Sequence, residues 1–433
     1  MMQLRRYARD PLYRNSLYLM ANTIVMAGLG FLFWIVAARF YAEAAVGLSS
    51  AIISAISFIA LLSGLGLNVS LVRFLPTAQK PIDLINSCFT LSGIVALAVA
   101  VIFIAGLSIW SPALGLIRED PIFSVAFVSI VLVWTMSTLM DFIFIGRRRA
   151  DLTLFKNTII SVLKIPLPIV LILSFKTFGI VASFGLATGI AVVISLLVFL
   201  PKAQDRYKPA LKIDVDTVKV VRRYSVASYL ASLLSTAPAV ILPIMVINIL
   251  GPVQNAYFYV AWLIASLLFA MPTAVAQSLF AEGAHFDAPL KANVVRSYKF
   301  IFMLLIPAII LLLLAGKWLL LAFGAAYSAN AMALLTILSI SSIFVGMNSV
   351  YLTILRITDR VVELVAICGF ITIAVLTASY YITPTTGIIG IGYVWLVAQG
   401  ATSLYVGWQL GRGFPTVSKT PQLKIESDED DDG

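Results

Sequence analysis

The sequence predicts an all-α membrane protein that crosses the bilayer many times. Of its 433 residues, 61% are hydrophobic and only 12% are charged, and the mean hydropathy is +1.01. A soluble domain carries roughly 25% charged residues. Half of that charge, placed between long apolar runs, indicates a surface that faces hydrocarbon and excludes a soluble fold.

A membrane-spanning helix needs about 20 mostly apolar residues. The chain contains twelve such runs, and the first is too long for a signal peptide, so we expect an uncleaved first helix. The predicted spans are 16–40, 46–72, 84–108, 121–146, 152–174, 178–200, 224–250, 254–280, 298–322, 328–355, 361–382 and 386–410. An even number places both termini on the same side of the membrane.

The basic residues support this topology. With twelve spans, 24 of the 30 Lys and Arg residues fall at one side of the membrane, 4 at the other and 2 within the fifth span. Lys and Arg accumulate in cytoplasmic connections. We therefore expect a multi-pass protein of the cytoplasmic membrane with both termini in the cytoplasm, and the net charge of +10 requires no nucleic-acid partner.

A long basic connection, 201–223, separates two sets of six spans. Six spans return the chain to its starting side, so the halves would be parallel repeats, and internal repeats are common in transporters. We predict an N-terminal lobe over 1–211, a C-terminal lobe over 212–425 and a central cavity between them. The acidic tail, 426–433, has nothing apolar to bury and is expected to be disordered.

Lys164 is the strongest functional signal, because a charge costs at least ~2.5–3.5 kcal/mol at the centre of a bilayer. If the fifth helix begins near Asp151, Lys164 lies roughly 20 Å along it. Pro166 and Pro168 follow and are expected to break or kink the helix. The pattern favours a lumen-facing site for an anion; the alternative is a lysine paired with backbone carbonyls or a carboxylate.

Further charged residues lie in or beside the spans. Lys156 is shallower than Lys164, and Asp141 on the preceding helix has a similar depth. We expect Asp141 and Lys156 to form a structural ion pair, although Lys156 is also a candidate to assist at the site. Arg73 ends the second span and is either a gate residue or an ordinary basic residue of the cytoplasmic side.

Uncharged polar residues recur at helical spacing in the seventh span, which contains Ser228, Tyr229 and Ser232, and in the tenth, beside Asn348. Such faces line an aqueous cavity or allow close helix packing. We favour a cavity for the seventh span. The candidate substrate-binding residues are Lys164, Lys156, Arg73, Asn22, Ser228, Tyr229, Ser232, Gln277 and Asn348.

Enzyme chemistry is not indicated. His285 is the only histidine, so no pair of histidines can bind a metal, and no nucleotide-binding glycine motif follows a strand. We expect no cofactor and no metal. A membrane-embedded polysaccharide polymerase or ligase is the alternative from another class, but it would need a large outer loop with functional Arg, His or acidic residues, and none is visible.

The N-terminal region resembles a known family. The resemblance lies in Arg14-Asn-Ser-Leu-Tyr, Ala38-Arg-Phe, Ala45-Val-Gly-Leu-Ser, Leu65-Gly-Leu-Asn and Val72-Arg-Phe-Leu-Pro, which are similar to the Wzx-like polysaccharide flippases of the MATE-like MOP exporter superfamily. It implies two lobes, alternating access and transport of a polyprenyl-diphosphate-linked oligosaccharide. Membrane lipids, a coupling ion and other polysaccharide-assembly proteins are then candidate partners.

A multidrug exporter of the same superfamily is the main alternative. Members of that type resemble cation antiporters, which often use an acidic residue in the N-terminal lobe. Here the first span carries Asn22 and no acidic residue, and the deepest charge, Lys164, is positive. Both features favour an anionic substrate.

Overall fold

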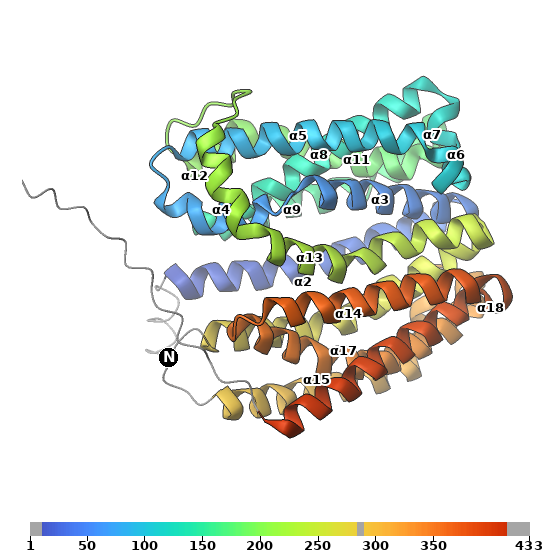
Figure 1. Cartoon of the computed structure of the whole chain (residues 1–433). Helices are drawn as coiled ribbons and strands as arrows, with labels where there is room; N and C mark the ends of the chain where they lie inside the picture. The colour runs from blue at the N-terminus through green and yellow to red at the C-terminus, as the bar shows by residue number, and fades with distance from the viewer. Residues whose placement is uncertain (1–10, 284–289, 414–433) are drawn as a thin grey trace, which may run out of the picture.

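The computed structural model describes residues 11–283 and 290–413, and within these ranges the chain is a bundle of long helices without a strand (Figure 1). The first half contains α2 (Pro11–Phe40), α3 (Glu43–Ser63), α4 (Leu67–Phe74), α5 (Pro81–Ala105), α6 (Leu107–Trp110), α7 (Leu116–Glu119), α8 (Pro121–Gly146), α9 (Ala150–Lys164), α10 (Leu167–Phe175), α11 (Gly179–Ile194) and α12 (Leu200–Ala203). The second half contains α13 (Val215–Leu250), α14 (Pro252–Gly283), α15 (Leu290–Leu321), α16 (Ala325–Asn330), α17 (Met332–Ile357) and α18 (Val361–Arg412). The predicted all-α membrane fold is confirmed; the acidic tail and His285 lie outside the described residues.

Eleven helices in the described ranges are long and apolar enough to cross a membrane. The last of them, α18, has 52 residues, which corresponds to roughly 78 Å of helix and far exceeds one bilayer crossing. Gly387 interrupts it with non-helical backbone (φ 66°, ψ −157°). Figure 1 shows the helix labelled α18 turning back on itself. This break favours two crossings in α18, while the total of twelve spans stays a prediction.

Long helices that follow each other run in opposite directions, so their connections gather at two ends of the bundle (Figure 1). We call the end that contains 75–80, 147–149 and 204–214 the basic end. The end that contains 106–120 and Gly251 is called the opposite end.

The predicted second span, 46–72, is wrong as a single helix. In the structure α3 ends at Ser63, and the separate short helix α4 begins at Leu67. Leu65 and Gly66 between them have positive φ angles of 47° and 76°. A left-handed backbone ends an α-helix because the hydrogen-bond ladder cannot continue through it.

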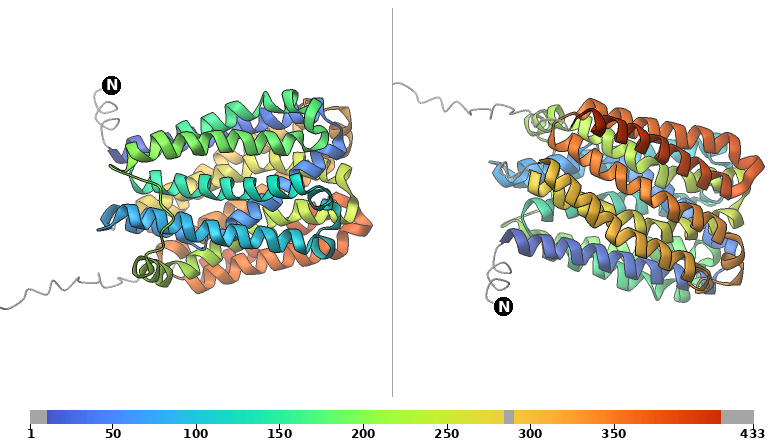
Figure 2. Two further views of the ribbon diagram at one scale, coloured as in Figure 1. Left: turned by 90° about the horizontal axis from the view of Figure 1, so that it is seen from above. Right: turned by 90° about the horizontal axis from the view of Figure 1, so that it is seen from below.

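The connection between the halves is shorter than predicted and is fixed to α5. Helix α13 begins at Val215, so the segment 204–214, which we call the strap, replaces the predicted connection 201–223. The strap runs extended across the bundle and is visible as a thin green trace in the left view of Figure 2.

Polar residues on one face of α5 hold the strap. These residues are Asp83, Asn86, Ser87 and Thr90, and their spacing of i, i+3, i+4 and i+7 places them on one face of the helix. Tyr207 Oη donates to Asn86 Oδ1 (3.0 Å), and Asn86 Nδ2 donates to the Lys208 carbonyl (3.0 Å). Lys212 donates twice, from Nζ to Asp83 Oδ2 (2.8 Å) and from its backbone N to Thr90 Oγ1 (3.3 Å). The backbone N of Asp214 donates to Ser87 Oγ (2.8 Å). The strap therefore belongs structurally to the first half, up to the start of α13.

The two halves pack closely at the opposite end, where α3 lies against α13 and α14. Gly47 permits this approach, because a Cβ atom there would lie 1.7 Å from the Pro252 carbonyl oxygen. Asn255 Nδ2 donates to the Gly47 carbonyl (2.7 Å) and to Ser50 Oγ (3.1 Å). Trp34 of α2 contacts Tyr259 of α14, with ring centroids 4.6 Å apart.

Candidate functional site

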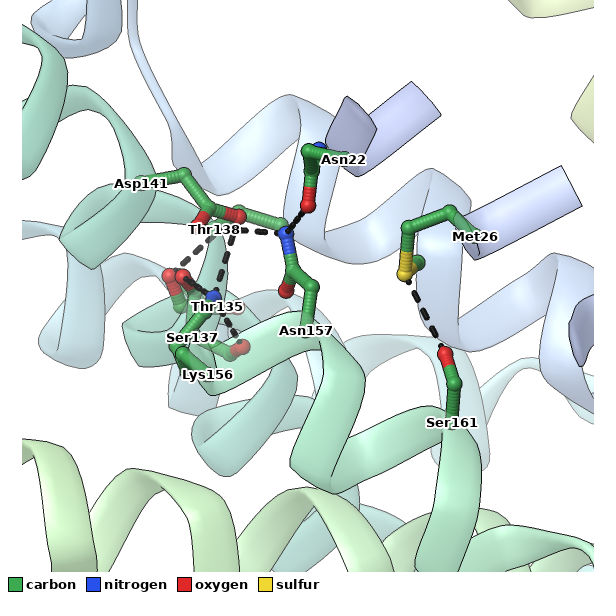
Figure 3. Close-up of polar contacts among 9 residues, drawn as sticks. All are labelled: Asn22, Met26, Thr135, Ser137, Thr138, Asp141, Lys156, Asn157 and Ser161. Carbon is green, nitrogen blue, oxygen red and sulfur yellow. Dashed lines mark hydrogen bonds and ion pairs between the residues drawn. The ribbon is translucent and has the colours of Figure 1, made fainter. Parts of the chain in front are cut away.

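Besides Thr153, four polar residues of α9 are buried, and they make contacts to α2 and α8. They are Lys156, Asn157, Ser161 and Lys164, and none is more than 8% exposed. Helix α9 begins at Ala150, and Asp151 in its first turn is paired to Arg149 (2.9 Å). Figure 3 shows the first three of these side chains pointing toward residues of α2 and α8.

The ammonium group of Lys156 is held by three acceptors on α8. Its Nζ lies 3.0 Å from Asp141 Oδ2 and donates to Ser137 Oγ (2.8 Å) and to the Ser137 carbonyl (2.6 Å) (Figure 3). The Lys156 side chain has no exposed surface, and three acceptors match the three protons of its ammonium group. This is the geometry of the expected structural ion pair between α8 and α9, and it leaves Lys156 without a free proton for a ligand.

Asn157 and Ser161 connect α9 to α2. Asn157 Nδ2 donates to Asn22 Oδ1 (3.0 Å) and, more weakly, to Asp141 Oδ1 (3.4 Å). Ser161 Oγ lies 3.3 Å from Met26 Sδ (Figure 3). Asn22, a predicted site residue, thus lies at the contact between α2 and α9, and Asn157 links it to the ion pair between α8 and α9.

Lys164 differs from Lys156 because no hydrogen bond or ion pair of its ammonium occurs among the described residues. Its Nζ lies 5.3 Å from the centroid of the Phe33 ring of α2, and the residue is 8% exposed. An aromatic face attracts a cation but replaces neither a hydrogen bond nor a counter-ion. The buried ammonium therefore keeps its capacity to bind an anion.

The helix is interrupted immediately after Lys164, as predicted. Helix α9 ends at Lys164, Pro166 lies in the turn and α10 begins at Leu167. Because proline has no N–H, Pro168 cannot donate to the Lys164 carbonyl four residues earlier. Lys164 stands about 21 Å along α9 from its start, beyond the middle of a bilayer crossing.

The predicted residues on α4, α13 and α17 whose side chains the structure describes do not converge on Lys164. Arg73 lies at the end of α4, at the basic end, with its guanidinium 5.8 Å from the centroid of the Phe74 ring. Tyr229 Oη donates to the Leu62 carbonyl (2.9 Å) and so joins α13 to α3. Ser232 is exposed on α13.

Asn348 is engaged within the second half. Its Nδ2 donates to Gln399 Oε1 (2.7 Å) and to the Gln399 carbonyl (3.0 Å), and its Oδ1 accepts from Ser403 Oγ (2.9 Å). These bonds hold α17 against α18. The side chains of Ser228 and Gln277 lie outside the described residues.

Sequence reasoning missed Asn157, Ser137 and Ser161. A signal was present, because Lys156, Asn157, Ser161 and Lys164 recur with helical spacing in an otherwise apolar span. The uncharged members of this face, Asn157 and Ser161, are as much a part of the pattern as the two lysines.

Comparisons with known proteins place the chain in a family. The sequence profile of the family described as "Polysaccharide biosynthesis protein" matches residues 12–261. No curated protein matches the chain.

Several solved structures have the same fold. An inward-facing and an outward-facing structure of a multidrug resistance MATE family transporter of the MOP superfamily match with TM-scores of 0.68 and 0.66, both at 17% identity, covering 89% and 96% of this chain and 94% and 98% of theirs. A MOP superfamily transporter from Pyrococcus furiosus, described as having a binding pocket of reverse polarity, matches with a TM-score of 0.65 at 15% identity, covering 94% of this chain and 96% of its own. The profile match covers more than half of the chain, which therefore belongs to the polysaccharide biosynthesis protein family of Wzx-like flippases and is a multi-pass membrane transporter with the MOP superfamily fold.

Proposed function

We propose that this transporter flips a polyprenyl-diphosphate-linked oligosaccharide across the cytoplasmic membrane by alternating access. The two lobes, which the sequence predicts as 1–211 and 212–425 and which the structure divides at the start of α13, would rock about a central cavity. The sugar would pass through this cavity while the prenyl tail stays in lipid. Family membership supports the substrate class. The single observation that carries the proposal is the buried ammonium of Lys164 without a counter-ion among the described residues.

A diphosphate suits this ammonium for electrostatic reasons. A buried charge is stabilised by an opposite charge, and an ammonium–phosphate hydrogen bond is charge-assisted. Lys156 lacks this capacity because Asp141 already neutralises it at 3.0 Å. Of the two lysines in the fifth span, Lys164 is therefore the proposed binding residue and Lys156 the structural one.

Lys164 also lies close to the contact between the halves. Phe33, which faces its ammonium, precedes Trp34, and Trp34 contacts Tyr259 of the second half with centroids 4.6 Å apart. An anion that draws the ammonium away from Phe33 would act on the segment of α2 that touches α14. This arrangement supports coupling between substrate binding and movement of the lobes.

The proposed orientation follows the basic residues. The basic end of the bundle would face the cytoplasm, with both termini on that side, because Lys and Arg are retained there. The opposite end, where the halves are packed together, would then face away from the cytoplasm. A substrate would enter from the basic end.

Transport by reconstituted protein tests the proposal. Proteoliposomes with a labelled polyprenyl-diphosphate oligosaccharide in the inner leaflet would be assayed for its appearance outside. Lys164→Ala and Lys164→Met should reduce the rate at least tenfold, and Lys164→Arg should retain part of it because the charge remains. Lys80→Ala, which removes an exposed lysine of the basic end, is the matched control.

Unchanged flipping by Lys164→Met would remove this residue from the site. If the wild type instead exports organic cations and ignores the lipid-linked glycan, the exporter alternative replaces the flippase. If the glycan is hydrolysed or polymerised rather than moved, the protein is an enzyme and the proposal fails.

A further inference from the structure

A pocket of about 350 Å³ lies at the opposite end, where the two halves meet. It is lined by Ala38, Tyr41, Ala42 and Glu43 of the first half and by Phe323, Gly324, Ala325, Ala326 and Tyr327 of the second. We call it the seam pocket. Because its walls come from both halves, separation of the halves at this end would take the pocket apart.

Glu43 is the only charged residue that lines the seam pocket. One of its carboxylate oxygens, Oε2, accepts a hydrogen bond from Tyr257 Oη (2.9 Å), and no Lys or Arg pairs with it among the described residues. Arg39 lies nearby, but its guanidinium donates to the carbonyls of Ala322 (2.7 Å) and Leu321 (2.8 Å) at the end of α15. The pocket therefore carries a carboxylate whose charge no basic side chain neutralises.

Tyr327 adds a second oxygen. It lines the pocket, and its hydroxyl has no hydrogen-bond partner although the residue is only 2% exposed. Glu43 and Tyr327 both line the pocket, and burial, followed by the charge of Glu43, raises the pKa of Tyr327. Carboxylate and hydroxyl oxygens are hard ligands that suit hard metal ions.

The donor set favours a single positive charge. The described residues contain no group of three or more Asp, Glu, His or Cys that would suit a divalent ion. One carboxylate with neutral oxygens balances one monovalent cation. The same carboxylate would repel a diphosphate, which separates this pocket from the proposed substrate site at Lys164.

We propose that the seam pocket binds a monovalent metal cation and that the bound cation holds the two halves together at the opposite end. A ligand that binds only the closed seam stabilises that state by mass action. This inference extends the proposed function: in a flippase, a cation arriving from that side after substrate release favours closure and return of the empty protein.

Thermal unfolding of the purified full chain tests the binding. The unfolding midpoint would be measured at constant ionic strength with NaCl, KCl, choline chloride or N-methylglucamine chloride. For the wild type we expect a concentration-dependent rise with Na⁺ or K⁺ relative to N-methylglucamine. Glu43→Gln should abolish the rise while keeping an oxygen that accepts from Tyr257, and Glu119→Gln, an exposed acid at the same end, should retain it.

Cross-linking tests the second part of the proposal. Ala38→Cys and Ala326→Cys place one thiol on each wall of the pocket, and the native Cys88 and Cys368 are buried. The metal cation should raise the rate of cross-linking at least twofold, and adding Glu43→Gln should remove this effect.

Two results would overturn the inference directly: an unfolding midpoint that does not change with Na⁺ or K⁺, or the same rise of the midpoint in Glu43→Gln as in the wild type. A rise with choline alone would also overturn it, because it would assign the pocket to an organic ammonium. None of these measurements involves flipping. If the lipid-linked glycan proves not to be the substrate, the measured effect of the cation on the unfolding midpoint still stands. If no cation binds, the proposed transport of the glycan is not affected.

Discussion

Asn157 of α9 donates a hydrogen bond to Asn22 of α2, and the two residues are 135 positions apart. The same separation of 135 joins Ala150 N to Asn15 Oδ1 (2.9 Å) and Ser161 Oγ to Met26 Sδ. A constant separation means that the two helices run parallel and in register. Their contact begins at the basic end and leads along α9 toward Lys164.

Removal of Asn157 should loosen this contact. Asn157→Ala loses the bonds to Asn22 and Asp141, and interhelical hydrogen bonds in membranes contribute about 0.6 and at most ~1.7 kcal/mol each. We expect a loss of about 1–2 kcal/mol in the free energy of unfolding, measured by denaturation in detergent. Asn330→Ala, whose side chain binds only its own helix, is the control; an equal loss in both variants would contradict the prediction.

The buried ion pair should show strong coupling. Asp141→Asn leaves the fully buried ammonium of Lys156 without its carboxylate, a change that costs about 3–5 kcal/mol in buried pairs. The double variant Asp141→Leu with Lys156→Met should recover most of this loss, because no unpaired charge remains. A double-mutant cycle of Asp141→Leu, Lys156→Met and the double variant, measured as unfolding free energies, gives the coupling, and additive effects would show that the two residues act independently.

Gly47 should tolerate no side chain. In Gly47→Ala the new Cβ would lie 1.7 Å from the Pro252 carbonyl oxygen, so α3 and α14 must move apart. We expect a destabilisation of about 1–3 kcal/mol, as for other overpacked sites, together with faster thiol labelling of Ala38→Cys at the seam. In Gly189→Ala nothing lies within 4 Å of the new Cβ, so this variant should be neutral or more stable; equal effects would refute the packing argument.

The strap should loosen at high pH. Burial raises the pKa of Tyr207 to about 12, above its usual value of 10. Because the folded pKa is raised, the contribution of the neutral phenol is complete below pH 10 and is lost as pH rises from 10 to 12, by on the order of 2 kcal/mol. Tyr207→Phe loses the bond to Asn86 but cannot ionise.

Unfolding midpoints of the wild type and Tyr207→Phe at pH 8 to 11 check this prediction. The difference between them should shrink or change sign above pH 10, since only the wild type loses stability through this group. A difference that stays constant with pH would mean that Tyr207 does not titrate in this range.

Much of the candidate site could be predicted, because both the cost of burying a charge and the effect of proline on a helix can be recognised in the sequence. Lys164 in an apolar span followed by Pro166 predicts a deep charge at a helix break, and the structure contains both. The expected cavity residue Asn348 instead binds Gln399 and Ser403, because polar residues at helical spacing serve packing as well as they line a cavity. Spacing alone does not say which helix lies opposite.

The sequence by itself determined the fold class, since apolar runs of bilayer length can satisfy their backbone only as helices in lipid. It also determined the depth of Lys164, because rise per residue is fixed by the helix. Only the tertiary structure decided that Lys156 is neutralised and Lys164 is not, that the strap is bound to α5, and that Glu43 faces residues near position 325 across the seam. These are contacts between segments far apart in the chain, and they depend on how helices pack rather than on the pattern within any one of them.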